Sequence, residues 1–168
     1  DWRDPDNIRQ DGSPEYDYIE EGYKRKDAAF DSVSELLLVK GVDRDLFDKI
    51  NGFITVYSLP NSGCQININT APLPVLEALG FSGADAGAII AARAGQDGIE
   101  GTSDDIPFNQ NAFAPYSEKL TPDNAKLVCY GSQFFRVISK GSASGGRAVK
   151  TVTCVISAAG DILYWNEE

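Results

Sequence analysis

The stretch Ile66-Asn-Ile-Asn-Thr-Ala-Pro72 decides the character of the helical part of this chain. Asparagine alternates with isoleucine, and a Thr-Ala-Pro step then leads into the apolar segment 73–79. Thr70 is expected to cap a helix over that segment, because prolines in the first turn cost little where the N–H has no helical partner. Gly80 is expected to end this helix. The small residues of segment 84–94 predict a second helix that packs closely on the first.

Short helices are also predicted on the N-terminal side of this unit. Residues 1–30 are acidic and rich in aromatic side chains, and we expect an ordered loop that these side chains hold in place. Ser32 and Glu35 have the spacing of a capping box and precede a run of leucines, which predicts a short helix. A further helix fits residues 43–50, with Asp43 as its cap and Leu46 on its buried side.

The chemistry of the chain changes towards its C-terminal end. Residues 95–118 form a long polar connection, and Thr121 is expected to cap another short helix. Three segments rich in β-branched and aromatic residues then predict antiparallel strands, at 133–139, 147–157 and 162–165. The fold class is therefore predicted to be α+β, with helices in the first two thirds and strands in the last third.

Charge and composition exclude several classes of function. The 168 residues carry 15 basic and 25 acidic side chains, so the formal net charge is −10 and a nonspecific binder of polyanions is disfavoured. Histidine is absent, which removes Ser-His-Asp catalysis and imidazole metal ligands. With 42% apolar residues the chain is predicted to be globular. Carboxylates, carbonyls and hydroxyls remain, and these groups suit hard cations.

The densest candidate site is Asp97-Gly-Ile-Glu-Gly-Thr-Ser-Asp-Asp105, which holds four carboxylates in nine residues. Ca²⁺ would relieve their mutual repulsion, since it accepts mixed carboxylate, carbonyl and hydroxyl oxygens in irregular geometry. The spacing is not that of an EF-hand. A solvated acidic loop without metal is the alternative. The candidate ligands, including the Ile99 carbonyl and the Thr102 hydroxyl, are Asp97, Ile99, Glu100, Thr102, Asp104 and Asp105.

Two weaker acidic hypotheses remain. Asp1, Asp4 and Asp6 could supply a second cation site, although a solvated surface is the more ordinary interpretation of such a cluster. Paired carboxylates also perform glycoside hydrolysis. Nothing besides their abundance supports catalysis here, so the chain is predicted not to be an enzyme.

The three cysteines, Cys64, Cys129 and Cys154, are too widely spaced to form a CxxC pair, which argues against a zinc knuckle or a thioredoxin-like motif. In an exported protein we expect one disulfide, between Cys64 and Cys129, with Cys154 as a thiol on a strand. Three unpaired buried thiols in a reducing compartment are the alternative.

The predicted helix pair also allows a different class of function. Residues 68–93 resemble the helix-hairpin-helix modules of competence-type DNA-binding proteins, whose exposed Gly-x-Gly amides hold a phosphate backbone. The hairpin Gly80-Phe-Ser-Gly83 is one residue longer than that pattern, and Arg93 is the basic residue nearby. DNA binding is therefore the runner-up, and the alternative is that the helix pair is simply a packing unit.

Taken in order along the chain, these segments resemble the K component of the type II secretion system, a minor pseudopilin family. The resemblance covers nearly the whole chain. Its most specific part is the order of a Ser-Glu-Leu segment, an Asn-x-Asn-Thr-Ala segment and terminal strands. The matching stretches are residues 1–6, Tyr16 and Tyr18, residues 30–41, residues 66–72 with Val75 and Leu76, and residues 134–165.

The resemblance implies a pseudopilin-like antiparallel sheet carried by a long N-terminal spine helix, with a large helical domain inserted into the sheet. Residues 1–125 would be most of this helical domain with its acidic loops, and residues 126–168 would be the strands of the pseudopilin core. The spine helix, the membrane anchor and the prepilin peptidase site are missing from this sequence, so we expect them upstream of Asp1.

The family's function follows as an expectation. The K subunit is expected at the tip of the periplasmic pseudopilus of the general secretion pathway, bound to the I and J minor pseudopilins. In the full-length protein the absent N-terminal anchor would hold it in the bacterial inner membrane, and the resemblance implies Ca²⁺ in its globular part. The chain is predicted to be a structural subunit for protein transport that binds no nucleic acid.

Overall fold

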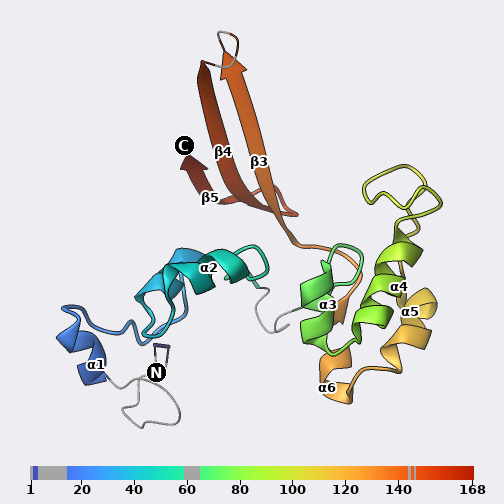
Figure 1. Ribbon diagram of the computed structural model, residues 1–168, viewed down its shortest axis with the longest axis horizontal. Helices are drawn as coiled ribbons and strands as arrows, with labels where there is room; N and C mark the ends of the chain where they lie inside the picture. The colour runs from blue at the N-terminus through green and yellow to red at the C-terminus, as the bar shows by residue number, and fades with distance from the viewer. Residues whose placement is uncertain (1, 4–14, 59–64, 144, 146) are drawn as a thin grey trace. The chain divides into compact units, whose positions relative to one another are not determined.

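The computed structural model describes residues 2–3, 15–58, 65–143, 145 and 147–168, with the backbone alone for residues 15–17. The chain divides into two compact units, Asp1–Tyr57 and Ser58–Glu168. Helices and short strands precede a three-stranded antiparallel sheet, so the predicted α+β class is confirmed (Figure 1). Within the described ranges, no helix combines the length and apolar character that crossing a bilayer requires.

The first unit contains the helix α1 (Glu15–Glu20), the 3-10 helix η1 (Val33–Leu38) and the helix α2 (Arg44–Ile50). Trp2, Tyr18 and Tyr23 form an aromatic cluster with ring centroids 5.3 to 6.2 Å apart. Aromatic side chains therefore hold this unit together, as predicted. The α1 helix was not predicted, because the acidic segment around it shows no helical period.

Two details of this unit differ from expectation. Ser32 does stand at the start of η1, but its hydroxyl pairs with that of Ser34, and the Glu35 carboxylate accepts from the Asp31 amide and from Lys26. The capping box is therefore wrong, and a 3-10 helix forms. Asp43 caps α2 as predicted, accepting from the Leu46 amide at 2.7 Å. The side chain of Leu46 is exposed rather than buried.

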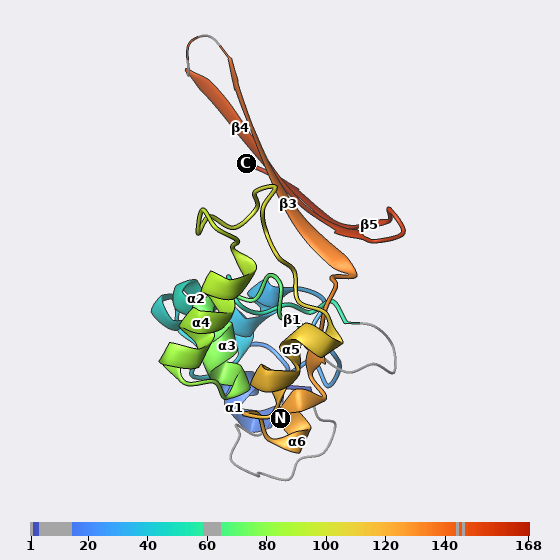
Figure 2. The same ribbon diagram turned by 90° about the vertical axis from the view of Figure 1, so that its right-hand side faces the viewer.

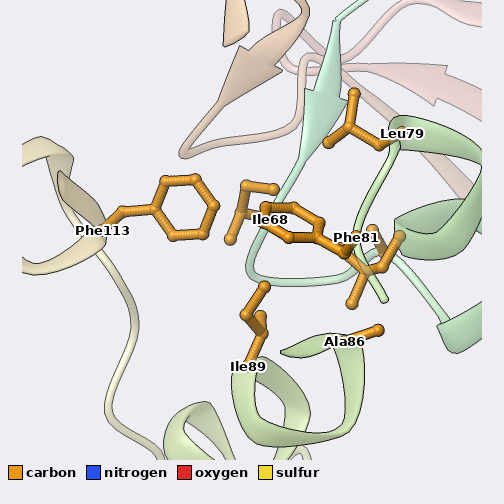
Figure 3. Packing of buried hydrophobic residues seen from close by; sticks show 8 residues of the cluster. Ile68, Leu79, Phe81, Ala86, Ile89 and Phe113 are labelled. Carbon is orange, nitrogen blue, oxygen red and sulfur yellow. The ribbon is translucent and has the colours of Figure 1, made fainter. Parts of the chain in front are cut away.

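In the second unit, helices form a core around residues 66–72. Its helices are α3 (Leu73–Leu79), α4 (Gly83–Arg93), α5 (Gln110–Ser117) and α6 (Pro122–Ala125). Side chains from these helices and their connections converge on one cluster (Figure 3). The residues at its centre are Ile68, Ala71, Leu76, Leu79, Phe81, Ala86, Ile89 and Phe113.

The predicted pair of packed helices, α3 and α4, is confirmed. Gly80 ends α3 with a φ of 112°, a conformation that favours glycine, and the Ser82 hydroxyl accepts from the Asp85 amide to begin α4. Thr70 is not the cap of α3, and this prediction was wrong. Pro72 occupies the cap position, because the chain first makes a turn in which the Thr70 amide donates to the Asn67 carbonyl.

The segment 95–118 is not a polar connection throughout, because it contains α5. Asn109 caps this helix by accepting from the Ala112 amide at 3.0 Å, and Phe113 is fully buried. Pro115 lies inside α5, and a proline at such a position disfavours a helix in a prediction from sequence. Thr121 caps α6 as predicted.

Two sheets complete the second unit. The short strands β1 (Ile66–Asn67) and β2 (Val128–Cys129) pair in parallel. The other sheet has the order β3-β4-β5 and is antiparallel, formed by β3 (Phe134–Ala143), β4 (Ala148–Ser157) and β5 (Ile162–Glu167). Because β5 pairs with the later part of β4, β3 and β4 continue beyond it as a two-stranded ribbon (Figures 1 and 2).

Candidate functional site

The predicted acidic site, residues 97–105, lies on the connection between α4 and α5. The Ile106 amide donates to the Arg93 carbonyl at 2.9 Å, which closes the loop at its base. Gly95 has a φ of +67°, and a Cβ there would lie 2.4 Å from the Asp104 carbonyl oxygen. The loop therefore needs glycine at this position for both its backbone conformation and its close packing.

Asp104 is the main hydrogen-bond acceptor inside the loop. Its Oδ2 accepts from the amides of Gln96 and Asp97 at 2.7 and 3.1 Å, and its Oδ1 accepts from the Thr102 hydroxyl at 2.6 Å. The Thr102 hydroxyl bond, followed by the two amide bonds, lowers the pKa of Asp104 to about 2. This carboxylate is therefore ionised throughout the physiological range and organises the loop.

The other predicted carboxylate ligands each make a contact of their own. Asp97 accepts from the Ile99 amide at 2.8 Å, and Asp105 accepts through Oδ2 from the Gly101 amide at 2.7 Å. Oδ1 of Asp105 is shielded from solvent and has no hydrogen-bond partner among the described residues. Glu100 forms an ion pair with Arg93.

Arg93 is the partner of Glu100. Its side chain is only 4% exposed, and it donates to both the Glu100 carboxylate and the Ile68 carbonyl. A buried guanidinium needs such a partner, so Glu100 neutralises it. Of the six candidate ligands, the structure thus connects Asp97, Ile99, Thr102 and Asp104 through hydrogen bonds of their backbone or side chains. No group of three or more carboxylate or cysteine side chains within the described ranges is arranged to hold a metal ion.

The turn between α3 and α4 has little in common with a phosphate-binding hairpin. Phe81 is buried within it, and the Asp85 carboxylate lies at the start of α4, where it accepts from the Ser82 hydroxyl at 2.7 Å and pairs with Lys119. The Lys119 and Ser82 bonds lower the pKa of Asp85, so the group is anionic. A phosphate at this position would meet a negative charge, and the geometry disfavours DNA binding there.

The sheet β3-β4-β5 presents two different faces. Because side chains alternate along a strand, Phe134, Ile138, Val149, Val155 and Tyr164 lie on one side of the sheet, and the register places a larger group of apolar residues on the other side. We call this the apolar face, and it consists of Phe135, Val137, Val152, Cys154, Ile156, Ile162 and Trp165. Trp165 is 53% exposed and Ile162 62% exposed, so a broad hydrophobic surface has no cover within the described chain.

Comparison with known families matches residues 1–60 to one family model and residues 66–124 to another, and both models are described as "Type II secretion system (T2SS), protein K". Together these matches extend over most of the chain. The chain belongs to the protein K family of the type II secretion system. A comparison with curated proteins finds no individual match.

Protein K is a structural component of the secretion apparatus, so the prediction that the chain is not an enzyme is confirmed. The family matches include the Asn-x-Asn-Thr-Ala segment that was singled out in the sequence. Membership also implies that the chain works with other secretion-system proteins.

Several predicted site residues of this protein K chain stay untested. Asp1, Asp4 and Asp6 of the second cation site, and Cys64 of the expected disulfide, lie outside the described residues. Cys129 lies on β2, and Cys154 lies on β4 as expected, where it forms no disulfide within the described part of the chain. The pairing of Cys64 with Cys129 therefore remains a prediction.

Two features were missed in the sequence. Asn69 lies in the quoted segment, but its role as a bridge to distant backbone groups has no local signal. The apolar face had only a weak signal, since Phe135 and Val137 flank Arg136 but are themselves flanked by Phe134 and Ile138. The strands were predicted from their β-branched and aromatic residues, and the uncovered surface was not identified.

Proposed function

We propose that this chain is the globular part of a minor pseudopilin that occupies the tip of the type II secretion pseudopilus. In this proposal residues 1–125 are the inserted helical domain and residues 126–168 are strands of the pseudopilin core. A long N-terminal helix upstream of residue 1 anchors the full-length protein in the inner membrane and leaves the globular part in the periplasm. Protein K family membership supports the proposal.

The observation that carries the proposal is the apolar face. Three strands are stable in water when one face packs against another element, and Phe135, Val137 and Trp165 lie exposed on that face. A long apolar helix would bury these side chains, which is the arrangement that the family resemblance implies. Burial of apolar surface contributes about 25 cal/mol per Å², so covering this face would stabilise the sheet considerably.

The partners in this proposal are the I and J minor pseudopilins. A bulky helical domain would obstruct the addition of a further subunit beyond it, which suits a terminal position. The helical domain then limits growth in one direction, while the spine helix and the sheet provide contacts to the subunits below.

Co-purification of the full-length protein with the I and J pseudopilins tests this function. A complex that elutes as one species on a sizing column is expected. A mobility shift with duplex DNA at about 150 mM salt, together with no I–J complex, would instead support the helix-hairpin-helix alternative.

We also propose that the loop 97–105 binds Ca²⁺, which would supply a positive charge to neutralise the carboxylates. The unpartnered Oδ1 of Asp105 supports this assignment, because a shielded carboxylate oxygen without a donor is costly. Asp97, Asp104 and Asp105 would supply carboxylate oxygens, with the Ile99 carbonyl and the Thr102 hydroxyl beside them. Glu100 would join them only by leaving Arg93.

A further inference from the structure

One stretch of this acidic chain has basic residues as its only charged side chains. The whole chain has a net charge of −10, yet residues 124–160 contain no aspartate or glutamate. The five basic residues in this segment are Lys126, Arg136, Lys140, Arg147 and Lys150. This stretch therefore has a formal charge of +5, opposite in sign to that of the whole chain.

The strand register places two of these charges on the side opposite the apolar face. Arg136 is opposite Val155, and Lys140 is opposite Thr151, so both side chains lie on one face of β3, four residues apart. That spacing corresponds to about 13 Å along a strand. Ile138 lies between them on the same face and is 62% exposed. We call this side, defined by Arg136, Ile138 and Lys140, the cationic face.

The charges on the cationic face are not neutralised within the described chain. Lys126 pairs with Asp123, and Lys150 pairs with Glu167. In contrast, no ion pair to a described carboxylate engages Arg136, Lys140 or the adjacent Arg147. Glu168 pairs with Thr151 through the backbone and therefore also lies on this side. Its carboxylate accepts a hydrogen bond from Nδ2 of Asn166 at 3.0 Å.

We propose that the cationic face docks an acidic protein segment of a neighbouring pseudopilin, which deepens the function proposed above and rests on it. The occupant carries two carboxylates about 13 Å apart, to meet Arg136 and Lys140, with an apolar side chain between them to cover Ile138. Arg147, in the turn just before β4, extends the same positive surface. The apolar face then remains for the spine helix, so the two sides of the sheet have separate partners.

Charge balance favours a protein segment over a membrane or a nucleic acid. Each basic residue near an anionic membrane contributes about 1 kcal/mol, and few basic side chains face outward here. An extended polyanion would also approach the remainder of a chain whose net charge is −10. A local acidic segment meets the cationic face alone and avoids that repulsion.

The test uses full-length protein with the I and J pseudopilins. The double variant Arg136→Glu/Lys140→Glu is expected to weaken complex formation by roughly tenfold or more, because it places like charges across the contact. Arg136→Gln/Lys140→Gln should weaken it less and should reduce its dependence on salt. Lys24→Glu/Lys49→Glu, which makes the same charge change on exposed residues of the first unit, should bind like the wild type.

Each other result has a distinct meaning. Wild-type affinity in the Arg136→Glu/Lys140→Glu variant, with a wild-type melting temperature, would overturn the docking proposal and leave the tip function standing. Failure of the wild-type protein to bind I and J would overturn both. Binding to phosphatidylglycerol vesicles or duplex DNA that the same double variant abolishes would assign the cationic face to a polyanion instead and overturn the protein docking proposal.

Discussion

Asn69 and Phe108 are joined by a reciprocal pair of hydrogen bonds. The Phe108 amide donates to Oδ1 of Asn69 at 2.7 Å, and Nδ2 of Asn69 donates to the Phe108 carbonyl at 3.0 Å. The same Nδ2 also donates to the Tyr130 carbonyl at 3.1 Å. One side-chain amide thus connects residues 66–72 to the chain before α5 and to the chain after β2.

Replacement of Asn69 by alanine is expected to lower the free energy of unfolding by about 1 to 3 kcal/mol, because partly buried backbone groups lose their partner. Chemical denaturation with Asn111→Ala as the control checks this prediction, since Asn111 is an exposed position of α5. Equal stability of the two variants would show that water satisfies the Phe108 and Tyr130 groups equally well.

The two glycines at the ends of the acidic loop's first turn offer a matched comparison. Gly95→Ala and Gly98→Ala both place a side chain at positive φ, +67° and +70°, which costs about 1 to 2 kcal/mol. At Gly95 the new Cβ also collides with Asp104, whereas at Gly98 it meets no described atom within 4 Å. We expect a clearly lower melting temperature for Gly95→Ala; similar values would contradict the close packing of Gly95 against Asp104.

The Asp104 carboxylate should make the loop sensitive to acid. Its pKa in the folded chain is lowered to about 2, so the stability that its ionised form contributes is fully present above the ordinary pKa near 4. That stability is lost as the pH falls from about 4 towards 2. The carboxyl resonance of Asp104 followed by NMR should titrate near pH 2. Titration near pH 4 would mean that its amide and hydroxyl bonds do not form.

Calcium should raise the melting temperature through Asp105. At a hundredfold excess over its dissociation constant, a cation that binds only the folded chain adds about 2.7 kcal/mol, which corresponds to several degrees. Asp105→Asn keeps an oxygen for the Gly101 amide and removes the charge, so it should abolish the calcium-dependent increase and preserve the melting temperature in EDTA.

Asp123→Asn is the control for calcium binding, because Asp123 is exposed on α6 and paired with Lys126. It should retain the full calcium response. An unchanged calcium response in Asp105→Asn would show that Asp105 is not a ligand. The absence of any response in the wild type would support the alternative of a solvated acidic loop without metal.

Local features of this fold could be predicted from the sequence because they depend on neighbouring residues. Asp43 and Thr121 cap their helices through amides three residues away, and Gly80 ends α3 through its own backbone freedom. The content of β-branched and aromatic residues likewise predicted the three strands. Thr70 and the Ser32 capping box failed because other nearby donors and acceptors, within a few residues, competed successfully for the same groups.

The candidate site was predictable only as a composition. The sequence alone determined that carboxylates crowd residues 97–105, that glycines allow its turns and that the chain resembles protein K. Only the tertiary structure decided that Glu100 pairs with Arg93, that Asn69 reaches Phe108 39 residues away, and that the sheet separates an apolar from a cationic face. The physical reason is that burial and strand register decide which side chains meet, and neither is contained in the local pattern of residues.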